Sequence, residues 1–148
     1  MKVLVDADSC PVVKEVEFVC KKHEVEAILV CDTSHILTSD YSKVIIADCG
    51  RDSADMVLLN RCEKGDVVVT GDYGLASLVL TKGGVCIKQS GMLYTEKNID
   101  TLIMQRYISK KARLMGERVK GPKKRKKEDS LIFLKAFENL ILERLKDR

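Results

Sequence analysis

The sequence predicts a three-layer α/β/α fold with a mainly parallel sheet of about five strands and a C-terminal helical extension. Short apolar runs of strand length alternate with helical segments over residues 1–94, which is typical of a parallel sheet covered by helices on both faces. The remaining residues show helical periodicity alone. A chain of 148 residues is also long enough for one domain with a substantial core.

The expected strands are runs rich in β-branched residues, bounded by turns or acids. They cover residues 2–5, 27–31, 44–47, 67–70 and 85–87.

Helical spacing of apolar residues and capping side chains place the expected helices. Pro11 suits a first helical turn, Asp52 with Asp55 three residues later predicts a capped helix start, and Thr95 predicts another. The helices are expected over residues 11–23, 52–63, 73–80, 96–115 (as one helix or as two) and 131–145. The inner face of the fourth is expected to carry Ile99, Leu102 and Ile103.

Charge is distributed unevenly along the chain. Residues 1–100 carry 11 Lys+Arg and 16 Asp+Glu, and residues 101–148 carry 15 and 6, so the net charges of −5 and +9 sum to +4. We expect a single domain, with an acidic α/β core in 1–94 and a basic helical extension in 95–148 that contains a loop at 116–129. The basic cluster predicts nucleic-acid binding, and a loop that only aids solubility is the alternative. Its members are Arg118, Lys120, Lys123, Lys124, Arg125, Lys126 and Lys127.

Composition argues against several classes of protein. No apolar run approaches the ~20 residues of a membrane-spanning helix, and the acid at position 6 comes early for a signal peptide, so we expect a cytoplasmic protein. Six cysteines without a C-x-x-C pair indicate reduced core thiols. Neither His23 nor His35 lies in a Ser-His-Asp or Cys-His signature, and the sequence has no glycine-rich phosphate-binding loop of a familiar type.

Acids lie where the expected sheet would bring them together. Asp6 and Asp8 follow the first strand, Asp72 follows the fourth, and Asp52 and Asp55 begin the intervening helix. Because the carboxyl ends of parallel strands meet at one edge of a sheet, all five can converge there. Clustered carboxylates repel one another unless a cation neutralises them, and ligand sets made only of oxygen favour Mg²⁺ or Mn²⁺. The sequence therefore predicts a site for one or two such ions.

Each acid also has a structural interpretation. Asp8 and Asp52 could cap helices, Asp55 could favour the positive end of a helix dipole, and Asp72 could be a turn residue. Capping and metal binding can coincide in one side chain. For Asp6 and Asp72, which end buried strands, we favour the functional interpretation.

A resemblance to a known family rests on three segments: VLVDADSCPV at 3–12, DSAD at 52–55 and GDVVVTGDYGLA at 65–76. Together they resemble the YaiI/YqxD family, and the Gly121-Pro122 step, Asp129 and Phe137 resemble its C-terminal pattern. That family is similar to the PIN-like (NYN/PIN) nucleases, whose acids at the carboxyl edge of the sheet bind divalent metal and cleave RNA or DNA. The resemblance implies a metal-dependent phosphodiesterase with a PIN-like fold, and RNA is the expected substrate.

The resemblance also implies roles for individual residues. The catalytic acids would be Asp6, Asp55 and Asp72. The resemblance does not fix the roles of Asp8 and Asp52, which we expect from their position to be further metal ligands. Related nucleases often carry another acid two residues after the position of Asp72, where this chain has Gly74. Asp8 or Asp52 could supply that charge.

Other side chains near these acids could assist. Ser9, Ser53 and Thr70 are expected to orient water or phosphate. Tyr73 and Tyr94 could stack on a base, and packing within the protein is the alternative.

Two other classes of protein stay open. A non-catalytic nucleic-acid- or protein-binding module is compatible with Gly74. A haloacid-dehalogenase-type phosphohydrolase also carries D-x-D after its first strand, but it needs a Lys between a strand ending in Ser or Thr and a Gly-Asp motif. Here Thr70 directly precedes Gly71-Asp72, so we rank the phosphohydrolase last.

Overall fold

A single sheet of six strands organises the computed structural model, which describes residues 1–147 except 9, 33–36, 48–52 and 120–123. The strands are β1 (Lys2–Asp6), β2 (Glu26–Asp32), β3 (Lys43–Ala47), β4 (Val67–Val69), β5 (Val85–Ile87) and β6 (Leu93–Tyr94). Their order is β3-β2-β1-β4-β5-β6, and all neighbouring pairs are parallel except β5 with β6. The mainly parallel sheet is confirmed. The two-residue β6 was not expected, because periodicity cannot identify so short a strand.

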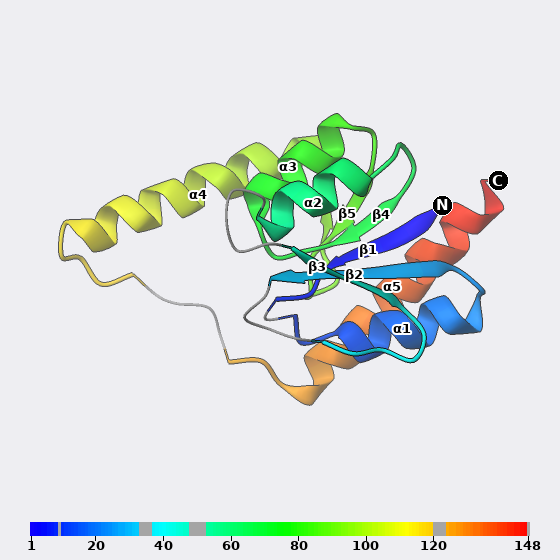
Figure 1. The fold of residues 1–148 in the computed structure, drawn as a ribbon. Coiled ribbons are helices and arrows are strands. Elements are labelled where there is room, and N and C mark those ends of the chain that lie inside the picture. Colours follow the sequence, from blue (N-terminus) through cyan, green and yellow to red (C-terminus); the bar gives the residue numbers. More distant parts are fainter. Residues whose placement is uncertain (9, 33–36, 48–52, 120–123, 148) are drawn as a thin grey trace.

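The described residues form five helices, which lie on both faces of the sheet (Figure 1). They are α1 (Val13–Lys22), α2 (Ala54–Arg61), α3 (Tyr73–Thr81), α4 (Glu96–Leu114) and α5 (Lys127–Lys146). Helices α1 and α5 cover one face, α2 and α3 cover the other, and α4 projects away from the body (Figure 1). Among the described helices, none combines the length and apolar composition needed to cross a membrane.

The central strand β1 is buried on both faces. Val3 and Val5 belong to the core cluster shared with α1 and α5, whereas Leu4 belongs to the cluster shared with α2 and α3. All three side chains are fully buried. This two-sided burial explains why the strand sequences are continuous apolar runs instead of alternating patterns.

Helix α5, at the end of the expected extension, supplies part of this core. Phe133 and Phe137 are fully buried and stack with ring centroids 5.4 Å apart. At the neighbouring surface, Glu138 accepts a hydrogen bond from Lys22 and lies 3.0 Å from Nε2 of His23 at the end of α1. The basic part of the chain is therefore held to the acidic part by apolar packing and ion pairs.

The structure corrects two of the expected helix caps and confirms a third. Ser53 caps α2 by accepting the N–H of Met56, whereas Asp52 lies outside the described residues. Asp8 does not cap α1, whose start has no side-chain cap. Thr95 caps α4 in a reciprocal capping box, and α4 is one continuous helix.

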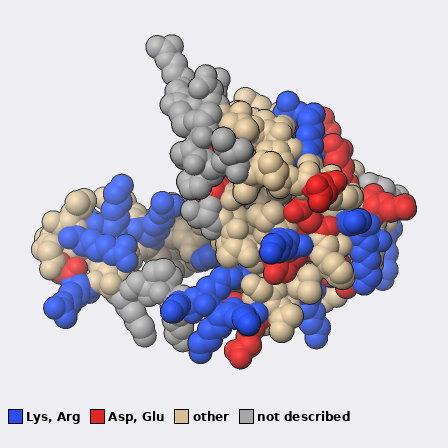
Figure 2. Space-filling view, turned by 60° about the horizontal axis from the view of Figure 1, so that its bottom comes forward, with Lys and Arg blue, Asp and Glu red and all other residues tan. Residues whose placement is uncertain are grey.

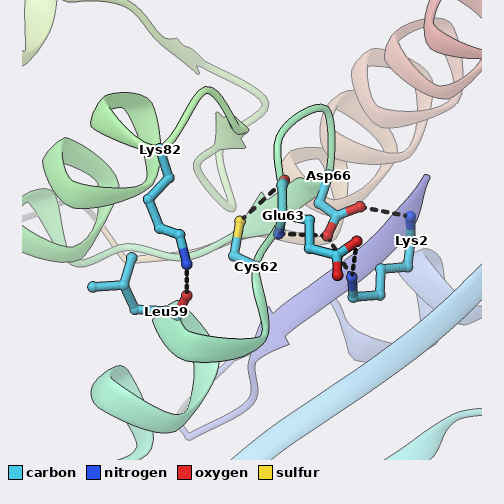
Figure 3. A network of polar contacts seen from close by, with 6 residues as sticks. All are labelled: Lys2, Leu59, Cys62, Glu63, Asp66 and Lys82. Carbon is cyan, nitrogen blue, oxygen red and sulfur yellow. Dashed lines mark hydrogen bonds and ion pairs between the residues drawn. The ribbon is translucent and has the colours of Figure 1, made fainter.

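A partly buried ion pair closes the edge of the sheet where β1 begins (Figure 3). Asp66, whose side chain is 5% exposed, accepts hydrogen bonds from the Lys2 ammonium at 2.7 Å, the Lys2 N–H at 3.1 Å and the Glu63 N–H at 2.8 Å. Burial opposes ionisation of the Asp66 carboxyl, but these hydrogen bonds outweigh it and lower its pKa. The pair lies at the opposite edge of the sheet from the end of β1.

Five cysteines fall among the described residues, and all are free thiols. They are Cys10, Cys20, Cys31, Cys62 and Cys86. Burial raises the pKa of Cys10 to about 11 and that of Cys20 to about 12, so both thiols stay protonated at neutral pH. Cys20, Cys31, Cys62 and Cys86 are buried, as predicted for core thiols, whereas Cys10 is half-buried. Cys49 and His35 lie outside the described residues.

Candidate functional site

Two of the predicted acids meet at the carboxyl ends of the neighbouring strands β1 and β4. Asp6 is the last residue of β1, and Asp72 lies three residues beyond β4 at the start of α3. Thr70, which is fully buried, connects them. Its hydroxyl donates to Oδ2 of Asp6 at 3.0 Å and accepts the N–H of Asp72 at 3.0 Å. One hydroxyl thus orients a carboxylate on one strand and the backbone after the other.

Two further acids complete a cluster of four. Asp55, in the first turn of α2, lies close enough to Asp72 for the two carboxyl groups to raise the pKa of Asp55. Asp8 accepts the N–H of Asp32 at 3.1 Å and lines a cavity together with Asp6 and Asp72. The structure therefore brings together Asp6, Asp8, Asp55 and Asp72, as the sequence predicted. Asp52 and Ser9 lie outside the described residues.

The carboxyl groups in this cluster ionise less readily than usual. Burial raises the pKa of Asp6 to about 6; the hydrogen bond from Thr70 opposes this shift, and the charges of Asp55, Asp8 and Asp72 add to it. Burial is also the main cause that raises the pKa of Asp55, and the nearby charge of Asp72 raises it further. Burial and mutual repulsion therefore disfavour the ionised forms of Asp6 and Asp55.

The chemistry of this donor set fits a divalent cation. All four side chains present carboxylate oxygens, the ligands that Mg²⁺ and Mn²⁺ prefer. A bound cation would also offset the charge repulsion that adds to the effect of burial on the pKa of Asp6. Within the described part of the chain, no three His, Cys, Asp or Glu side chains lie in a ready arrangement for coordinating a metal.

Gly74 has a local structural reason. Oδ1 of Asp72 accepts the N–H of Gly74 at 2.9 Å and that of Leu75 at 3.3 Å, which caps α3. A Cβ at position 74 would lie 3.3 Å from the same Oδ1, closer than most side chains permit. The close approach of Asp72 in this cap therefore favours glycine at position 74, and an acid there would require Asp72 to shift.

The cavity above these acids is about 680 Å³ and has a wall from α4. None of the residues in this wall was predicted to belong to the site. Arg106 approaches the cluster, with Nη1 3.7 Å from Oδ1 of Asp72. The wall residues are Leu102, Gln105, Arg106, Ser109 and Arg113. Their spacing of i, i+3, i+4, i+7 and i+11 was the signal available in the sequence.

The cavity also receives side chains from the segment after β5. Lys88 and Gln89 line it together with the acids and α4. Nζ of Lys88 donates to the Tyr73 hydroxyl at 2.8 Å and lies 4.8 Å from the centre of its ring. Like the α4 wall, this lysine was missed, because an isolated Lys after a short strand has no sequence signature.

The predicted basic cluster lies elsewhere. Arg118, Lys124, Lys126 and Lys127 are exposed, and none of these four lines the cavity. Arg125 is half-buried and donates to the carbonyl of Gln89 at 3.1 Å, which attaches the segment before α5 to the rim of the cavity. Lys120 and Lys123 lie outside the described residues.

The remaining accessory residues have structural contacts. Ser53 uses its hydroxyl to cap α2 and lines a second hollow with Asp55 and Asp72. Tyr94 is 3% exposed and donates to the carbonyl of Thr70 at 3.2 Å, so it packs within the protein and does not present a stacking surface. Tyr73 packs edge-on against Tyr94, with centroids 5.9 Å apart.

Replacing Thr70 with valine is expected to destabilise the protein and to raise the pKa of Asp6 further. Valine keeps the shape but removes the donor to Asp6 and leaves the N–H of Asp72 without its acceptor, at a cost of about 1–3 kcal/mol. Urea unfolding and a ¹³C NMR titration of the Asp6 carboxyl test the two effects. Thr70→Ser keeps the hydroxyl, so its free energy of unfolding and the pKa of its Asp6 should stay near those of the native protein. An unchanged Asp6 pKa in Thr70→Val would contradict the assigned contact.

The fold and the site define a class: an α/β protein with a carboxylate cluster at the carboxyl edge of a mainly parallel sheet. Residues 4–143 match the model of the family described as "Uncharacterized BCR, YaiI/YqxD family". The chain belongs to this family.

Relatives of similar length support the assignment. A UPF0178 protein of Clostridium acetobutylicum is 49% identical over 144 residues, which cover 96% of this chain and 97% of that protein. A UPF0178 protein of Natranaerobius thermophilus is 45% identical over 144 residues, which cover 97% of this chain and 95% of the other. No solved structure matches the chain with significance.

Proposed function

We propose that this protein is a metal-dependent nuclease that hydrolyses phosphodiester bonds, with RNA as its substrate and a three-layer PIN-like arrangement around its sheet. The observation that carries the proposal is the convergence of Asp6, Asp8, Asp55 and Asp72 at the carboxyl edge of the sheet, with burial and mutual repulsion raising the pKa of Asp6. Such a cluster favours binding of a divalent cation.

In this proposal Asp6, Asp55 and Asp72 hold Mg²⁺ or Mn²⁺, and Asp8 adds negative charge beside them. When bound, the ion supplies Lewis-acid chemistry: it offsets charge on a phosphate oxygen and lowers the pKa of the attacking water. Thr70 holds the Asp6 carboxylate in one orientation through its hydroxyl. Asp72 combines ligation with the cap of α3, since its Oδ1 serves the cap and its second oxygen has no role there.

A second candidate is a non-catalytic nucleic-acid-binding module of the same fold. Gly74 favours it, because the acid that often supplies a further metal ligand in PIN-like nucleases is absent from this position. The two candidates differ in one measurable property, since a binding module would retain nucleic acid without cutting it.

Removing a single ligand is expected to abolish metal binding without unfolding the site. Asp72→Asn suits this test, because asparagine caps a helix as well as aspartate does. Calorimetric titration of Mn²⁺ into the metal-free native protein should show saturable binding, weakened by at least about 100-fold in Asp72→Asn. Asp40→Asn is the matched control: it removes the same charge from an exposed residue beside α1.

Cleavage of labelled RNA is measured on the same three proteins, with and without EDTA. Cleavage that needs the metal and Asp72 but not Asp40 supports the nuclease. Metal binding without cleavage would support the binding module instead. Equal Mn²⁺ binding by all three proteins would overturn the proposed ligand set, and a covalent aspartyl-phosphate would indicate a phosphohydrolase.

A further inference from the structure

The α4 wall of the cavity is the part of the molecule that the proposed carboxylate chemistry leaves without a role. Helix α4 packs on the body only near its start, where Ile99 is 5% exposed and Leu102 half-buried. Ile103, expected on the inner face, is 38% exposed. Beyond this point the helix projects from the body (Figure 1).

The two sides of the projecting helix differ in chemistry. The side that lines the cavity carries Gln105, Arg106, Ser109 and Arg113. The other side carries exposed apolar residues together with Lys111. These apolar residues are Met104, Tyr107, Ile108 and Met115. A helix face that lines a cavity is usually apolar, so two arginines, a glutamine and a serine in this position indicate a polar ligand.

The sign of the charge identifies that ligand as an anion. Residues 101–116 contain four Lys+Arg and no acid. Figure 2 shows Lys and Arg side chains gathered over the projecting end of α4. Lys88 adds a third cation to the lining of the cavity, beside Arg106 and Arg113. These cations line the same cavity as Asp6, Asp8 and Asp72, so an anion bound there would lie next to the carboxylate cluster.

The spacing of the arginines fits an anion with repeated charges. Arg106 and Arg113 are seven residues apart on one helix face, or about 10 Å along the axis. This distance corresponds to about three nucleotides of a stacked strand at ~3.4 Å each. Arg106 also lies within 3.7 Å of Asp72, so its guanidinium reaches the edge of the carboxylate cluster.

We infer that the cavity-facing side of α4 binds the backbone of the nucleic acid, with Arg106 on the phosphate next to the carboxylates and Arg113 on a phosphate further along the strand. This inference rests on the proposed function and assigns substrate positioning to α4 in place of the basic cluster of residues 118–127. Guanidinium groups suit the role, because they donate two parallel hydrogen bonds to a phosphate. Both arginines are positioning residues and take no part in bond cleavage.

Binding of a labelled single-stranded oligonucleotide of about 12 nucleotides tests the inference by fluorescence anisotropy. Ca²⁺ replaces Mg²⁺, since it binds oxygen ligands with less demanding geometry. Arg106→Gln and Arg113→Gln should each weaken binding about tenfold, the effect of losing one charge-assisted hydrogen bond. Each should also reduce the slope of log K against log salt by about one.

Lys111→Gln is the matched control, because it removes the same charge from the opposite side of the same helix. It should change affinity less than twofold, and Arg106→Lys should recover part of the lost affinity. Equal weakening by Arg106→Gln, Arg113→Gln and Lys111→Gln would overturn the inference, since only net charge would then matter. Thermal unfolding of each variant verifies that the fold is intact.

The outcomes separate this inference from the proposed function. Selective weakening of binding in the arginine variants, together with no RNA cleavage by the native protein, would support nucleic-acid binding by α4 and contradict nuclease activity. RNA cleavage by the native protein, with unaltered binding in both arginine variants, would support nuclease activity and contradict nucleic-acid binding by α4. An absence of oligonucleotide binding by the native protein would overturn both.

Discussion

Replacing Asp6 with asparagine is expected to abolish cleavage and, in the same protein, to increase stability in the absence of metal. Asp6 would be a ligand of the ion, so its loss should reduce cleavage by at least about 100-fold. Asparagine keeps an oxygen that can accept from Thr70 but removes a charge that burial and three neighbouring acids disfavour. A residue that improves function at the expense of stability is typical of a functional site.

The sign of the stability effect follows from the raised pKa. Because the pKa of Asp6 is about 6 in the folded protein and 3.8 as its ordinary value, the folded state binds the proton more tightly than the unfolded state does. The stabilisation that comes from this tighter proton binding is complete below pH 3.8 and is lost as the pH rises through about 6. The free energy of unfolding of Asp6→Asn at pH 7 should therefore exceed that of the native protein by about 1–2 kcal/mol, after allowing for solvent screening.

Urea unfolding in EDTA at several pH values measures this difference. It should be largest above pH 6 and vanish below pH 3.8. Addition of Mn²⁺ should raise the stability of the native protein alone. Asp40→Asn again serves as the control. A destabilised Asp6→Asn at pH 7 would contradict the interpretation of Asp6 as an unfavourably placed carboxylate.

Replacing Asp66 with asparagine is expected to have the opposite effect on stability, with a loss of about 3 kcal/mol and intact chemistry at the site. Asp66 accepts three hydrogen bonds at the edge of the sheet where β1 begins, so its removal leaves the ammonium of Lys2, whose side chain is 18% exposed, without its close partner. Cleavage measured well below the unfolding temperature should be unchanged, because the carboxylate cluster lies at the other edge.

The matched control for Asp66 is Glu63→Gln. Glu63 lies 3.6 Å from the same ammonium but its side chain is 82% exposed, so the change should cost less than about 1 kcal/mol. The pKa of Asp66 is lowered, so its stabilisation is complete at pH 7 and is lost as the pH falls below 3.8. Urea unfolding at pH 7 and at low pH tests both points. Equal losses of stability in Asp66→Asn and Glu63→Gln would contradict the expectation that the buried partner of Lys2 contributes more than the exposed one.

Much of the acid cluster could be predicted from the sequence because its members follow local signals. Asp6 ends an apolar run, and Asp72 lies in a Gly-Asp step after another. Once the strands are taken as parallel, their carboxyl ends must share an edge. The hydrogen bonds through Thr70 were not predictable in detail, since they depend on the register that pairs Val5 with Val69.

The basic residues that line the cavity were not predicted from the sequence. Nucleic-acid binding by the dense cluster of residues 118–127 stays a prediction; its exposed members Arg118, Lys124, Lys126 and Lys127 do not line the cavity. Arg106 and Arg113 do, although they are scattered along a helix. The density of basic residues along the sequence does not show which of them share a surface, because only every third or fourth residue of a helix lies on the same face.

Five of the six described strands, most of the helices, the parallel direction of the sheet and the four acids at its edge could be predicted from the sequence, because apolar periodicity and capping act within a few residues. Two features emerged only in the folded chain: α5 completes the core through Phe133 and Phe137, and α4 brings Arg106 to Asp72. These features join parts of the chain that lie far apart in sequence. Their energies come from packing and electrostatics between surfaces, which no local pattern encodes.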